Sequence, residues 1–83
     1  MKITEIRKYL LDKYDCIKDV RVNELVSTDT WKIIGNRVTA TLDNKAMYSA
    51  KWIEGIRLEI GAKEGFVTSV RNRLTLIYNF YDE

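Results

Sequence analysis

The sequence predicts an α+β fold in which one N-terminal amphipathic helix packs on a five-stranded antiparallel β-meander. Three observations lead to this prediction. Apolar residues recur at helical spacing near the N-terminus, and apolar and polar residues alternate through most of the remaining chain. Turn-forming segments separate the alternating stretches, so each stretch is expected to pair with the next. The 83 residues are expected to form one domain, residues 1–83.

Residues 3–14 have the pattern of an amphipathic helix. Glu5 lies in its first turn and Lys13 in its last, as the helix dipole prefers. No other helix is expected, so this one is the available cover for the sheet, with residues 15–19 as the connection. The apolar stripe comprises Ile3, Ile6, Leu10, Leu11 and Tyr14.

Three short strands are expected next. Residues 20–26 alternate between valine or glutamate and other side chains, and residues 27–29 have the composition of a turn. A second strand over residues 31–34 is predicted to join a third over residues 37–42. The two-residue turn between them is Gly35-Asn36, because both residue types tolerate positive φ.

Residues 44–54 are ambiguous. Asn44 is a plausible cap for a helix from Lys45 to Glu54 that ends at Gly55. The alternative is a strand joined by a three-residue turn, in which Leu42 pairs with Ala46. The strand is preferred because it keeps the apolar face continuous.

The last third of the chain predicts a long hairpin. Residues 46–60 and 66–81 alternate in mirror order around a glycine-bounded loop at 61–65. This register places the polar residues Glu54 and Asn72 opposite each other. The apolar face of the whole sheet would comprise Trp31, Ile33, Val38, Leu42, Trp52, Ile56, Leu58, Phe66, Val70, Leu74 and Leu76.

Composition argues against most catalytic chemistry. Histidine is absent and Cys16 is the only cysteine, so the usual general base, a zinc site and a Cys–His pair are not available. We therefore expect no enzyme, no metal and no cofactor, although a metal-free ribonuclease built on Tyr, Arg, Lys and Glu remains open. The absence of a membrane-spanning run and of a signal sequence predicts a cytoplasmic protein. Abundant Ile, Lys, Asn and Tyr suggest an AT-rich gene, as in low-GC bacteria or their phages.

A surplus of positive charge lies in the expected sheet. Residues 1–29 carry six basic and six acidic side chains, whereas residues 30–81 carry eight basic and four acidic ones. The formal net charge of +2 is too small to indicate nucleic-acid binding by itself.

The uncovered sheet face is the candidate binding surface. Arg37 should lie opposite Lys51, with Arg73 one pair away, and such clustered cations invite an anionic partner. An ordinary solvated face is an equal alternative. Polar side chains expected there are Lys32, Arg37, Thr39, Thr41, Ser49, Lys51, Arg57, Ser69, Arg71, Arg73 and Thr75. Apolar ones are Leu25, Ile34, Met47, Ile53, Val67, Ile77 and Tyr81.

Two functions follow. The first is a small non-catalytic protein that inhibits or modulates a partner protein through this face or an edge strand. The alternative is a nucleic-acid-binding protein, with RNA as the expected ligand, that uses the basic sheet face and has Tyr48 or Tyr81 as stacking groups. A homodimer through residues 66–81 is also expected, because a terminal strand leaves one edge unpaired. The predicted partner-binding residues are Lys32, Arg37, Lys51, Arg57, Arg71, Arg73, Ile53, Ile77 and Tyr81.

Overall fold

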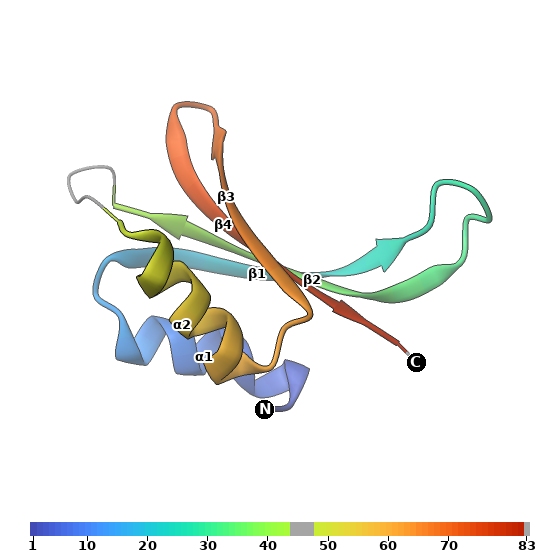
Figure 1. Ribbon diagram of the computed structural model, residues 1–83, viewed down its shortest axis with the longest axis horizontal. Coiled ribbons are helices and arrows are strands. Elements are labelled where there is room, and N and C mark those ends of the chain that lie inside the picture. The colour runs from blue at the N-terminus through green and yellow to red at the C-terminus, as the bar shows by residue number, and fades with distance from the viewer. Residues whose placement is uncertain (44–47, 83) are drawn as a thin grey trace.

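A computed structural model describes residues 1–43 and 48–82. The elements in chain order are α1 (Ile3–Lys13), β1 (Ile17–Val26), β2 (Ile33–Leu42), α2 (Ala50–Ile60), β3 (Glu64–Val70) and β4 (Arg73–Tyr81). The described strands form one antiparallel sheet in the order β1-β2-β4-β3, and both helices pack on the same side of it (Figure 1). The predicted α+β class, N-terminal helix and antiparallel sheet are confirmed. The predicted number of strands is wrong, because the described residues form four strands and a second helix.

Helix α1 follows its apolar periodicity. Ile6 and Leu10, four residues apart, are fully buried against the sheet, and the helix ends where Tyr14 becomes extended. Strand β1 then begins at Ile17, inside the segment expected to be a connection. The N-terminal part of the fold was therefore predicted to within a few residues.

Helix α2 replaces most of the predicted strand over residues 46–60. The Ser49 side chain accepts a hydrogen bond from the Trp52 N–H at 3.1 Å, which caps the first turn. The helix ends at Gly61, whose φ of +79° is the left-handed conformation that favours glycine. The alternative helix prediction was thus right in kind, but the helix runs through Gly55. Its proposed cap and first residues, together with the pairing of Ala46 and the face assigned to Met47, fall on residues 44–47, which lie outside the described residues.

Gly35 lies within strand β2 and not in a turn, contrary to the prediction. It pairs with Leu25 on one side and with Tyr81 on the other. A Cβ at this position would come within 1.8 Å of the Phe80 carbonyl oxygen. Glycine is therefore required by the close approach of two strands, so residues 33–42 form one continuous strand.

The predicted single strand over residues 66–81 is interrupted by a tight turn. Arg71 and Asn72 have φ values of 51° and 65°, and Val70 pairs with Arg73 across them. This is a two-residue hairpin of the left-handed kind that matches the twist of the strands. The two paired residues share a face, so the alternation of apolar residues changes face at the turn.

The change of face redistributes the predicted core. Phe66 and Val70 leave the helix-covered side, and Phe66 is 44% exposed on the other. Val38, Leu42, Ile56 and Leu76 are buried as predicted, and Trp52 and Leu74 pack partly buried against them. The prediction is wrong for Trp31, Ile33 and Leu58, which are exposed at 80%, 54% and 65%.

Strand β4 lies inside the sheet, paired with β2 on one side and β3 on the other. The predicted unpaired edge on the last strand is therefore wrong, and the edge strands of the described sheet are β1 and β3.

Glu59 joins the two helices. Its Oε1 accepts hydrogen bonds from Lys13 Nζ at 2.7 Å, from the Tyr14 hydroxyl at 3.2 Å and from the Tyr9 hydroxyl. Burial opposes ionisation of this carboxyl group, but the hydrogen bonds from Lys13 and Tyr9 outweigh it, so the pKa of Glu59 falls below its ordinary value. The charged form of Glu59 therefore stabilises the packing of α1 against α2.

Substitutions at Ile56 and Leu58 should separate the helix from the strand that the sequence favoured. Ile56 is buried and Leu58 is exposed on α2, whereas a strand would place both on one face. We expect Ile56→Ala to lower the free energy of unfolding by about 2–5 kcal/mol. Leu58→Ala should change it by about 0.5 kcal/mol or less. Equal losses in urea denaturation would contradict the helix.

The Glu59 contact should make stability depend on pH. A lowered folded-state pKa gives stabilisation that is present above the unfolded pKa and lost as pH falls through the folded value. Glu59→Gln should thus reduce the free energy of unfolding at pH 7, on the order of 1 kcal/mol after screening. The difference from wild type should shrink below about pH 4. Asp15→Asn, a change at an exposed carboxylate, is the control. A Glu59→Gln deficit that stays constant down to pH 3 would refute the role of ionisation.

Candidate binding face of the sheet

The helices cover one side of the sheet, and the other side, termed the open face, bears no described element (Figure 1). Strand register fixes its composition because alternate residues share a side. From β1 to β3 across the sheet, the open face carries Asp19, Arg21, Asn23 and Leu25; Ile33, Gly35, Arg37, Thr39 and Thr41; Arg73, Thr75, Ile77, Asn79 and Tyr81; and Glu64, Phe66, Thr68 and Val70.

Cross-strand rows give the open face an order. One row runs Asp19, Thr41, Thr75, Thr68; the next runs Arg21, Thr39, Ile77, Phe66; the third runs Asn23, Arg37, Asn79, Glu64. Residues in neighbouring rows of one strand lie about 7 Å apart. The exposed Phe66 ring is therefore one row from the threonines, on the same surface.

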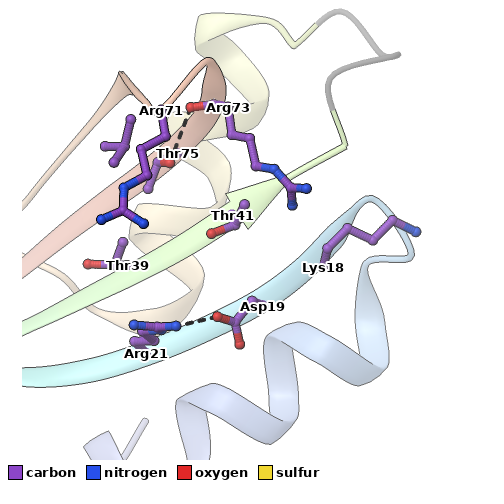
Figure 2. A pocket seen from close by; sticks show the side chains of 9 residues that line it. Lys18, Asp19, Arg21, Thr39, Thr41, Arg71, Arg73 and Thr75 are labelled. Atoms are coloured by element: carbon purple, nitrogen blue, oxygen red, sulfur yellow. Dashed lines mark hydrogen bonds and ion pairs between the residues drawn. The ribbon is translucent and has the colours of Figure 1, made fainter.

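A hollow of about 550 Å³ lies over the threonine end of the open face and is here termed the cationic pocket. Figure 2 shows Arg71 and Arg73 extending from the β3–β4 hairpin toward opposite sides of it, with Arg21 on β1 across from them and the Lys18 side chain pointing outward at the rim. Its lining residues are Lys18, Asp19, Arg21, Thr39, Thr41, Val70, Arg71, Arg73 and Thr75.

Positive charge in the cationic pocket is largely uncompensated. Arg21 Nε lies 3.2 Å from Asp19 Oδ2, so this cation shares its charge with a neighbour. Among residues 1–43 and 48–82, no carboxylate forms an ion pair with Lys18, Arg71 or Arg73. The pocket is consequently suited to an anion.

The other end of the open face is electrically balanced. Arg37 Nε donates to Asn79 Oδ1 at 2.9 Å, and Asn79 Nδ2 donates to Glu64 Oε1 at 2.7 Å. The Tyr81 hydroxyl also donates to Glu64, and the hydrogen bonds from Tyr81 and then Asn79 lower the pKa of this carboxyl group. Asn79 is only 2% exposed, so the network fixes this end of the face.

The structure separates the predicted binding residues into three groups. Arg37, Arg73, Ile77 and Tyr81 lie on the open face, and Arg71 reaches over it from the turn. Lys32 lies in the loop before β2. The remaining three, Lys51, Ile53 and Arg57, are on α2, on the opposite side of the sheet.

The predicted cluster of Arg37, Lys51 and Arg73 is not formed. Lys51 lies in the helical layer, and Arg73 is six residues along β4 from Asn79, the partner of Arg37. That separation corresponds to about 20 Å. Arg57 donates to Glu54 at 2.9 Å and to the Ala62 carbonyl at 2.9 Å, so it holds the end of α2.

Sequence reasoning missed Lys18, Arg21 and Phe66. Arg21 alternates with Val20, which is buried, and Val22, which is partly buried, so its position on the open face was available from the pattern. Lys18 lies at an irregularity in the register between Ile17 and Asp19, which sequence alternation does not reveal. The position of Phe66 on the open face could be assigned only once the turn at Arg71-Asn72 was known.

The β1–β2 hairpin extends beyond the helices as an arm (Figure 1). Trp31, near its tip, has a φ of 58°, and its N–H donates to the Ser27 carbonyl at 2.8 Å. With Val26 and Ile33 also exposed, the arm presents an apolar surface at the opposite end of the sheet from the cationic pocket.

No protein-family model, no curated protein and no solved structure matches this chain. Neither helix in the described part of the chain has the length and apolar character needed to cross a membrane. Within residues 1–43 and 48–82, acidic and cysteine side chains form no group that would hold a metal ion.

Proposed function

We propose that this protein is a non-catalytic binding protein whose open face holds a single-stranded nucleic acid. The observation that supports this most is that uncompensated cations and an exposed aromatic ring share one surface: Arg73 lies two rows from Phe66, about 13 Å along the strands. Cations pair with the phosphates of a strand, and an exposed aromatic ring stacks on an unpaired base. Arg71 and Arg73 are the phosphate contacts and Phe66 is the stacking platform.

The form of the open face favours a single strand over a duplex. An exposed antiparallel sheet supplies an aromatic ring beside basic and hydroxyl side chains, which suits splayed bases. RNA and DNA both carry the required phosphates and bases, and 2′-hydroxyl contacts would distinguish them. Threonines in the first two rows provide donors and acceptors for such contacts.

The proposed action is binding alone. The chain has no histidine, and the two carboxylates on the open face are each held by neighbours: Asp19 by Arg21, and Glu64 by Tyr81 and Asn79. A lowered pKa keeps Glu64 ionised, which suits an anchoring role better than that of a general acid.

Binding of a partner protein is the second candidate function, and it is the one that the sequence analysis placed first. The supporting observation is the arm, where Trp31 is 80% exposed beside Val26 and Ile33. Exposed aromatic and aliphatic groups of this kind are typical of protein interfaces. Inhibition or modulation of such a partner, and a homodimer through residues 66–81, remain predictions; within that range, β3 is the strand with an unpaired edge in the described sheet.

Binding of short labelled single-stranded RNA and DNA, followed by fluorescence anisotropy, tests the proposal. The double variant Arg71→Ser/Arg73→Ser should bind at least about tenfold more weakly at low salt and should flatten the salt dependence by about 1.4 in log–log slope. Lys8→Ser/Lys51→Ser removes the same charge from the helices and should bind like wild type, apart from a small general effect.

Phe66→Leu provides an independent second test of the proposal. It keeps an apolar side chain but removes the stacking surface, so affinity should fall while the salt slope stays unchanged. Failure of wild type to bind either nucleic acid at low salt would refute the proposal. Equal losses in the two double variants would show that the open face is not the site.

A further inference from the structure

We propose that the cationic pocket binds a terminal phosphate, a phosphomonoester dianion, so that the protein recognises the end of a nucleic-acid chain. This inference rests on the proposed function, since it names the group that occupies one end of the same face. It depends on the position of the pocket, on its charge and on the backbone of Arg71.

The cationic pocket lies where the sheet ends. Arg73 is the first residue of β4, Thr41 is next to the last residue of β2, and Lys18 is the second residue of β1. Arg71 closes the same end from the hairpin turn (Figure 2). A nucleic-acid chain that lies parallel to the β-strands, and so crosses the rows from Phe66 toward Thr75, reaches the end of the sheet here, and its last phosphate enters the pocket.

The charge of the cationic pocket matches a dianion. Four cationic side chains and one carboxylate line it, which leaves three positive charges for the ligand. A phosphodiester carries one negative charge, whereas a phosphomonoester carries nearly two at neutral pH. The additional charge and third terminal oxygen of a phosphomonoester would use guanidinium groups that an internal phosphate leaves unpaired.

The cationic pocket has threonine hydroxyls on its floor and one guanidinium group on either side (Figure 2). Figure 2 shows the Arg71 side chain reaching toward Thr39, and that of Arg73 extending toward the side of Thr41. One guanidinium group can donate two parallel hydrogen bonds to a phosphate, and threonine hydroxyls can donate to the oxygens that remain. A volume of about 550 Å³ accommodates the sugar that carries the phosphate as well.

The backbone of Arg71 supports a binding role. Its φ of 51° lies in the left-handed region, and the first position of such a turn favours asparagine, aspartate or glycine. An arginine held in this conformation is strained, and strain of this kind gathers at functional sites. The same backbone conformation aims the side chain back over the sheet (Figure 2).

The other cations near hollows do not match this arrangement. A second hollow of about 580 Å³ beside the end of α2 is lined by Arg57 and Lys63. Arg57 already bonds Glu54 and the Ala62 carbonyl. Arg37 is likewise engaged with Asn79 on the balanced end of the open face.

The test compares one oligonucleotide sequence in three forms, with a 5′-phosphate, with a 3′-phosphate, or with hydroxyl groups at both ends. One phosphorylated form should bind wild type about tenfold more tightly than the hydroxyl form, because it alone places a dianion in the pocket. Arg71→Asn should abolish this preference while leaving the melting temperature unchanged or raised, because asparagine suits the turn. Lys51→Asn, with the same loss of charge on α2, should retain the preference.

Asp19→Asn should strengthen the preference, since it removes the carboxylate that lines the pocket. Equal binding of all three oligonucleotides would overturn the inference and leave the proposed function intact. Binding of a nucleoside monophosphate that Arg71→Asn abolishes, with no binding of any oligonucleotide, would support the phosphomonoester site and overturn the proposed function. Phosphate-dependent binding that survives Arg71→Asn would also overturn the inference.

Discussion

The left-handed turn at Arg71-Asn72 is the constraint on which the rest of the architecture depends. Two residues reverse the chain, so Val70 faces Arg73 and β3 folds back along β4. Strand β4 is thereby enclosed between β2 and β3, and Leu76 and Tyr78 are buried beneath the helices. The turn also places a strained arginine at the end of the open face.

The two helices cover one side of the sheet and leave the other side open (Figure 1). Helix α2 carries the chain from β2 to β3 across the same side that α1 covers, and Glu59 joins it to Tyr9, Lys13 and Tyr14. Apolar side chains from both helices fill that side. Polar and cationic side chains are consequently gathered on the open face, where the balanced Arg37 network separates the arm from the cationic pocket.

Sequence periodicity could predict α1, the antiparallel sheet and the face carrying Thr39, Arg73 and Thr75, because each lies in an uninterrupted element. It could not decide α2, since Trp52, Ile56 and Ile60 are spaced by four, which fits both a strand and a helix. The exposure of Leu58 and the packing of Ile53 against the core distinguish the two. The two-residue turn shifts the alternation of faces by one residue between β3 and β4. The sequence Arg71-Asn72 is not the Asn-Gly pair that is typical of such a turn, so periodicity did not reveal the turn.

Mapping of backbone amide chemical shifts during titration with a single-stranded oligonucleotide tests the central claim most directly. If the open face is the binding surface, the largest changes will fall on Thr41, Phe66, Arg73 and Thr75, around the cationic pocket, and the exposed side of α2 will be unaffected. Changes confined to the helices, or to the arm around Trp31, would contradict the assignment of the open face as the nucleic-acid site.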